Sequence, residues 1–166
     1  MSDTRDIETL CPSIFDRLID EDPDRRGPDL PKSRTVLVRD LCRSVGRDLS
    51  RMLNTRRFHV PLPADLLELH PACLDYGIRD FNGVDISSKT ARGELRDHIE
   101  RAIRRHEPRF QRVTVELLDN TDPSDRTLRL RINAILRQDS VLEPIVFDTV
   151  VEPANCGVSV EGRSNE

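Results

Sequence analysis

Residues 88–118 read SKTARGELRDHIERAIRRHEPRFQRVTVELL, and this stretch decides the fold because a helix passes directly into a strand within it. Apolar side chains recur at one-turn spacing on the face that we expect to lie inward: Leu95, Ile99, Ala102 and Ile103. That spacing predicts a helix over 88–106. Apolar and polar residues then alternate over 110–118, which predicts a strand.

The junction Glu107-Pro108-Arg109 is the least ordinary part of this stretch. Pro108 ends the helix, because the residue before a proline is steered out of the helical region. Glu107 then places an anion at the negative end of the helix dipole, which is mildly unfavourable. With 108–110 extended, Glu107 and Arg109 project to the same side, in phase with Val113. We therefore expect an ionic pair at the end of the strand's apolar row.

Two interpretations of this pair stay open from the residues alone. In the first, a Glu107–Arg109 bridge fixes the helix–strand corner and contributes about 0–1 kcal/mol if exposed. In the second, the pair anchors an interface, because the planar guanidinium suits carboxylates and carbonyls of a protein partner. The second interpretation predicts that Arg109→Ala leaves the stability of the isolated domain nearly unchanged.

An earlier helix is predicted from Ser33, which can cap it, to about Leu53. Its inward face carries an apolar residue at every fourth position: Leu37, Leu41, Val45, Leu49 and Leu53. Arginines recur with the same period and form what we call the basic row: Arg39, Arg43, Arg47 and Arg51. Both a solvated face and a contact with an acidic surface on another subunit explain the basic row.

The remaining chain divides at its proline-rich and polar stretches. Residues 12–20 form a short amphipathic helix, and 21–33 a stiff, charged linker, so 1–32 is an arm that either docks on its own domain or lies across a partner. A single α+β domain follows over 33–151. The polar tail 152–166 should be loose and flexible.

The fold class follows from the order of helices and strands. Further strands are expected over 127–137 and 144–151, and the apolar segment 54–86 should fold back as a lid over the core. The expected fold is α+β: two long helices and a short N-terminal helix packed on a three-stranded antiparallel sheet. With 144–151 as its last strand, the sheet has an exposed edge that includes Val146.

Composition excludes several classes of function. The chain of 166 residues has a net charge of -4, which argues against binding of nucleic acid or anionic membranes. It has neither an apolar run of membrane-spanning length nor a signal-peptide core at its amino terminus, so we expect a cytoplasmic protein. The scattered cysteines and histidines predict no metal site and no cofactor: Cys11, Cys42, Cys73, Cys156, His59, His70, His98 and His106.

Four motifs in order resemble the family of TssE and phage baseplate-wedge proteins of contractile tails. They are 13–18 (SIFDRL), 38–41 (VRDL) leading to 52–56 (MLNTR), 76–81 (YGIRDF), and Glu107-Pro108-Arg109. Two positions depart from the usual pattern: Arg79 stands where a proline is common, and Phe110 where a leucine is usual. Glu-Pro-Arg alone is a weak signal, but four motifs in this order are a strong one.

The resemblance implies a non-enzymatic baseplate subunit of a type VI secretion system, in an assembly docked at the inner membrane. It implies binding to the wedge proteins TssF and TssG and to TssK, and a place beneath the first ring of the TssB–TssC sheath. The sheet would resemble the handshake fold through which sheath subunits exchange strands, and would template sheath assembly. The expected partner-binding residues are Glu107, Pro108, Arg109, Phe15, Arg17 and Leu18.

Two rival functions remain. A muramidase, suggested by the family's older lysozyme-related label, needs two carboxyls across a sugar cleft, but the chain has no Trp and a single Tyr for sugar stacking. A free-standing anti-adaptor of the same fold class would bind a protease's delivery factor. The proteins that copurify with the chain discriminate these functions. No small-molecule substrate is expected.

Overall fold

Two helices and four strands make up the part of the chain that the structure, a computed structural model, describes. The described residues are 18, 33–57, 76–81, 85, 87–120, 125–138, 141–152 and 157–163. The elements are α2 (Arg34–Asn54), α3 (Lys89–His106), β1 (Phe110–Leu118), β2 (Leu128–Gln138), β3 (Val141–Glu152) and β4 (Gly157–Arg163). The α+β class predicted from the sequence is confirmed.

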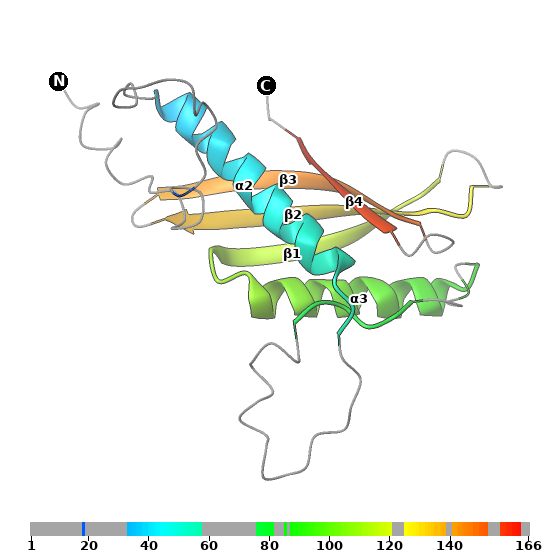
Figure 1. Ribbon diagram of the computed structural model, residues 1–166. Coiled ribbons are helices and arrows are strands. Elements are labelled where there is room, and N and C mark those ends of the chain that lie inside the picture. The colour runs from blue at the N-terminus through cyan, green and yellow to red at the C-terminus, as the bar shows by residue number, and fades with distance from the viewer. Residues whose placement is uncertain are drawn as a thin grey trace, which may run out of the picture.

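The four strands form one antiparallel sheet in the order β1-β2-β3-β4. Figure 1 shows α2 crossing one face of the sheet diagonally and α3 running beside β1. The C-terminal end of α2 touches β4, because the side-chain nitrogen of Asn54 donates to the Val158 carbonyl at 2.7 Å. At the opposite edge of the sheet, hydrogen bonds from side chains of α3 to the backbone of β1 hold α3 against that strand.

Both helices begin where the sequence predicts. Ser33 caps α2 by accepting a hydrogen bond from the Val36 amide, and Ser88 caps α3 in the same way through the Ala91 amide. A serine in this position satisfies an amide that has no partner within the first helical turn. The predicted helical spans are therefore confirmed to within one residue at each end.

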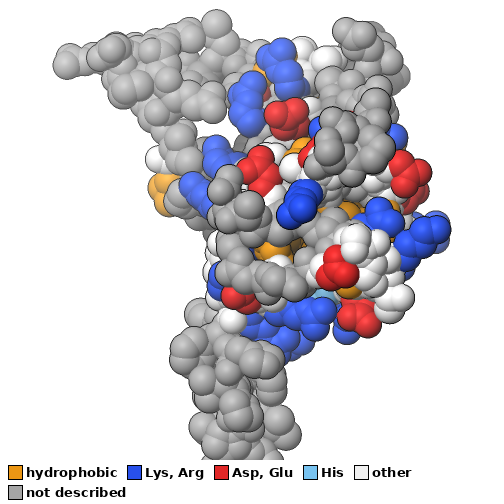
Figure 2. Space-filling model, turned by 90° about the vertical axis from the view of Figure 1, so that its right-hand side faces the viewer, with side chains coloured by type: hydrophobic (Ala, Val, Ile, Leu, Met, Phe, Trp, Pro, Cys, Tyr) orange, Lys and Arg blue, Asp and Glu red, His pale blue; other side chains and the backbone are white. Residues whose placement is uncertain are grey.

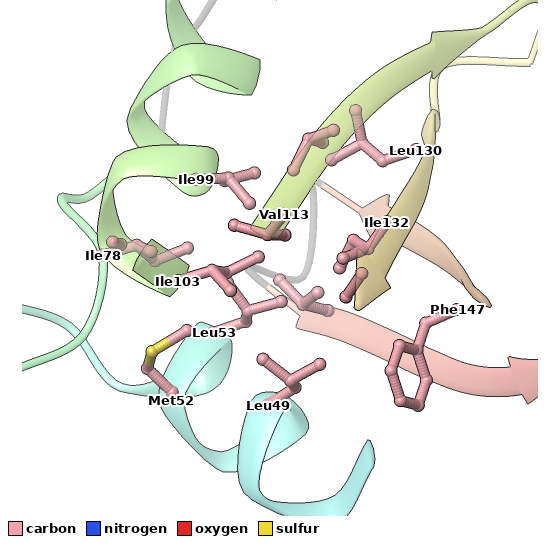
Figure 3. Packing of buried hydrophobic residues seen from close by; sticks show 14 of the residues in the cluster. Leu49, Met52, Leu53, Ile78, Ile99, Ile103, Val113, Leu130, Ile132 and Phe147 are labelled. Atoms are coloured by element: carbon pink, nitrogen blue, oxygen red, sulfur yellow. The ribbon is translucent and has the colours of Figure 1, made fainter. Parts of the chain in front are cut away.

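The core lies between the two helices and the covered face of the sheet (Figure 3). Leu49, Met52 and Leu53 of α2 meet side chains from the other elements, among them Ile99 and Ile103 of α3. The sheet contributes the alternating positions that the sequence assigned to its inward face, together with Phe147 of β3: Val113, Val115, Leu128, Leu130, Ile132, Ala134 and Leu136.

Part of the predicted lid is described, and it packs into this core. Ile78 and Phe81 are fully buried, and the Arg56 guanidinium lies 4.4 Å from the centre of the Phe81 ring. Ile78 exchanges backbone hydrogen bonds with Thr55 and Arg57. The chain reaches this position through Gly77, whose φ of 99° is in the left-handed region that favours glycine.

The sheet corrects the prediction of three strands. Residues 157–163, expected to be loose, form a fourth strand because Val158 and Val160 pack against the core. The alternation is short, because only Val158 and Val160, separated by Ser159, carry it. Val146 is consequently not at a free edge, since it pairs with Asn133 of β2 and Arg163 of β4.

Two other predictions concern the phase of β1 and the N-terminal helix. A bulge between Phe110 and Arg112 breaks the regular phase of β1, so Phe110 packs against the core like Val113 although the two residues are an odd number of positions apart. The predicted N-terminal helix lies outside the described residues except for Leu18.

Candidate functional site

The corner between α3 and β1 is held by the side chain of Glu107. This residue caps α3, and its own amide donates to the Ile103 carbonyl at 2.9 Å. Glu107 is only 6% exposed. Its two carboxylate oxygens accept from Nε and Nη2 of Arg109, both at 2.6 Å, and Oε1 also accepts from the Arg109 amide. The bidentate pair fixes the turn through Pro108 in one geometry.

Asp48 of α2 completes the cluster. Nη2 of Arg109 donates to Oδ2 of Asp48 at 2.8 Å, which ties the α3–β1 corner to the helix that crosses the sheet. Hydrogen bonding to Glu107 is the main cause that raises the pKa of Arg109 above its ordinary value, with Asp48 adding to it. The guanidinium also offsets the unfavourable position of Glu107 at the end of the helix dipole.

These contacts support the structural interpretation of the Glu107–Arg109 pair. An exposed bridge contributes little, but Glu107 is buried and would remain without a counter-ion if Arg109 were removed. This geometry therefore argues against the expectation that Arg109→Ala spares stability, and unfolding of that variant tests it. A partner at this corner would contact the atoms around the pair, because Glu107 and Asp48 already occupy the guanidinium of Arg109.

A half-open hollow of about 330 Å³ lies beside the cluster. Its lining combines apolar side chains with the ionic cluster: Asp48, Leu49, Met52, Tyr76, His106, Glu107, Pro108 and Arg109. Tyr76 and His106 meet edge to face with 5.4 Å between their ring centroids. Burial, followed by the charges of Asp48 and Glu107, raises the pKa of Tyr76 above its ordinary value. The tyrosine therefore stays neutral at physiological pH.

The six predicted site residues do not all lie at the hollow. Glu107, Pro108 and Arg109 all line it, but Pro108 is exposed, Glu107 is buried, and the side chain of Arg109 is 26% exposed. Leu18 is 77% exposed, and Phe15 and Arg17 lie outside the described residues. The structure thus brings together the three residues of the Glu-Pro-Arg motif and does not test the arm.

Sequence reasoning did not place the other five lining residues at this site: Asp48, Leu49, Met52, Tyr76 and His106. Asp48 had a signal, because it interrupts the arginine-rich face of α2 and is the acidic residue there that reaches the corner. Tyr76 opens one of the four motifs, but its distance from the corner in sequence hid the contact. Among the described residues, no group of His, Cys, Asp and Glu could hold a metal ion.

Comparison with family models shows to which family the chain belongs. The family described as baseplate wedge protein gp25 matches residues 39–141. The chain belongs to this baseplate wedge family. TssE is a member of the same family. The match includes every described residue of the hollow but ends before most of β3 and all of β4. No curated protein and no solved structure matches the chain.

Membership in the gp25 wedge family indicates a structural role in a baseplate. Within the described residues, neither helix has a stretch long and apolar enough to cross a membrane.

Proposed function

We propose that this chain is the TssE-type subunit of a type VI secretion baseplate, which joins the TssF–TssG wedge to the first ring of the TssB–TssC sheath and templates its assembly. The observation that carries the proposal is the locked Glu-Pro-Arg corner beside a half-open hollow, within the part of the chain that matches the wedge family. The protein acts without catalysis, by presenting surfaces in fixed positions.

The corner suits a contact that must hold its shape. Arg109 locks Glu107 and Asp48, so the rim of the hollow does not need to become ordered when a partner binds. Tyr76, which is 37% exposed, and Pro108 offer apolar surface at the rim. A side chain of TssF or TssG that enters the hollow would pack on these two residues, while the partly buried ion cluster keeps the adjoining wall rigid.

The distribution of charged side chains on the surface favours binding to proteins. On the side of the molecule shown in Figure 2, Lys and Arg side chains are mixed with Asp and Glu over the described surface. A mixed surface favours complementary protein contacts over nucleic acid, which needs a continuous basic field. We place the protein in the cytoplasm, where TssK and the wedge proteins would hold it at the inner-membrane assembly.

Copurification of TssF, TssG and TssK with Tyr76→Ala tests the proposal. The change removes the exposed aromatic rim at a cost of about 0.5–1.5 kcal/mol from the lost ring contact. We expect the domain to remain folded and the yield of wedge proteins to fall at least tenfold, since a buried aromatic at an interface is often a dominant contact.

Arg96→Ala is the matched control, because Arg96 is an exposed arginine on α3 that pairs with Asp97 away from the hollow. It should leave the wedge yield unchanged. Equal yields from the wild type and Tyr76→Ala would contradict the role of the hollow. Capture of a protease delivery factor in place of wedge proteins would favour the anti-adaptor, and peptidoglycan hydrolysis by the pure protein would favour a muramidase.

A further inference from the structure

We propose that the incoming sheath strand pairs with β4, and that α3 closes the opposite edge, β1. This inference rests on the proposed function as a sheath template and adds to it the edge that accepts the strand. An antiparallel sheet with four strands has two edges, and each edge strand points the N–H and C=O of alternate residues outward. The two edge strands, β1 and β4, differ in how many of these outward groups are already hydrogen-bonded.

The outward groups in the middle of β1 are already bonded. Nη2 of Arg104 donates to the Val113 carbonyl at 3.0 Å, and the Val115 amide donates to Oε2 of Glu100 at 2.9 Å. Arg104 and Glu100 also pair with each other at 2.6 Å. Together these two side chains of α3 occupy the backbone positions that an added strand would need. Figure 1 shows α3 running beside β1, where that strand would lie.

The edge at β4 is bonded only at its beginning. The side-chain amide of Asn54 takes both outward groups of Val158: its oxygen accepts from the amide at 2.9 Å, and its nitrogen donates to the carbonyl at 2.7 Å. Because outward residues alternate, Val160 and Gly162 also point their backbone groups away from β3. No residue in the described ranges bonds to these groups.

The Asn54 amide imitates one peptide group of a neighbouring strand and therefore marks where the added strand ends. Beyond the other end of β4, the first residues of β3 have no β4 partner. Pro144 in that stretch lacks an N–H, and edge strands commonly carry proline where pairing is to be avoided. The usable acceptor thus lies at Val160–Gly162.

The basic row on α2 favours a strand from another protein over a second copy of this chain. Gly46 packs over Phe147 of β3 and Asn54 binds β4, so the side of α2 that carries them lies over the β3–β4 part of the covered face. Arg43 and Arg39 precede Gly46 by three and seven residues and lie on the adjoining helix surface, where Arg43 also makes an exposed pair with Asp40 at 3.5 Å. Two copies paired through β4 would bring these arginines together, whereas a partner strand with acidic side chains would complement them.

Proline substitutions at equivalent positions of the two edges test the inference. Val160→Pro and Leu117→Pro each remove an outward N–H from a half-buried residue and leave the internal ladder bonds in place. In cells with fluorescent TssB, we expect at least tenfold fewer sheaths with Val160→Pro and wild-type numbers with Leu117→Pro. Wedge copurification should persist with both, and the reverse pattern for sheaths would assign the acceptor to β1.

Amide hydrogen exchange of the wild-type protein supplies a test that does not depend on how the variants fold. Adding purified TssB–TssC should slow exchange at Val160 and Gly162 at least tenfold and leave Val113 and Leu117 unchanged. Sheath binding without protection at β4 would overturn the edge assignment while sparing the proposed function, and absence of any wedge or sheath binding would overturn the proposed function itself. Protection at β4 that rises with concentration of the chain alone would instead assign the edge to a second copy.

Discussion

Replacing Arg109 with alanine should destabilise the isolated domain. The change removes two hydrogen bonds to Glu107 at 2.6 Å and one to Asp48 at 2.8 Å, and leaves the carboxylate of Glu107 buried without its cation. Breaking a fully buried ion pair costs about 3–5 kcal/mol. Because the Arg109 side chain is 26% exposed and water can reach the gap, we expect a loss of about 2–3 kcal/mol.

Urea unfolding followed by circular dichroism measures this free energy, and the thermal midpoint should fall by about 4–12 °C for a domain of this size. Arg96→Ala, which removes an exposed pair, should stay within about 0.5 kcal/mol of the wild type. Adding Glu107→Gln to Arg109→Ala removes the buried charge and should recover part of the loss. If Arg109→Ala were as stable as Arg96→Ala, the corner would not depend on the ion cluster.

Two further changes probe the backbone around the core. Gly77→Ala should cost at least about 1–2 kcal/mol, because its φ is left-handed and a Cβ would overlap the Thr55 carbonyl; Gly93→Ala, in open space on α3, should instead stabilise by about 0.5–1 kcal/mol. Similar thermal midpoints for the two variants would contradict this contrast. Asn54→Ala should cost about 1–3 kcal/mol and speed amide exchange at Val158, since it leaves both outward groups of that residue unbonded. Unchanged exchange at Val158 would show that the side-chain amide is not the cap.

The fold was predictable where the hydrophobic pattern was regular. Serine caps and one-turn spacing located both long helices, and strict alternation located the first two strands. The fourth strand escaped because it is short and places only Val158 and Val160 against the core, between polar neighbours. The bulge after Phe110 also left no signal, since it depends on how β1 meets β2.

The candidate site was predictable in its sequence-local part. Glu107 and Arg109 are two residues apart, so their pairing followed from backbone geometry and the cost of an anion at a helix C-terminus. Asp48 joins them across 61 residues of sequence, a contact that only the packing of α2 against the corner creates. Tyr76 reaches the hollow through the turn at Gly77, and no periodicity predicts where that turn leads.

The Glu100–Arg104 pair that covers the middle of β1 also bears on how many strands can be added to the sheet. On the proposed assignment, a sheet with one covered edge would accept a single added strand, and the number of sheath strands started by a baseplate would equal the number of these subunits in it. Growth would have one direction only, away from β4. Both side chains of the pair lie within 15 residues of the strand they cover, so the cover can form as soon as α3 and β1 have been synthesised.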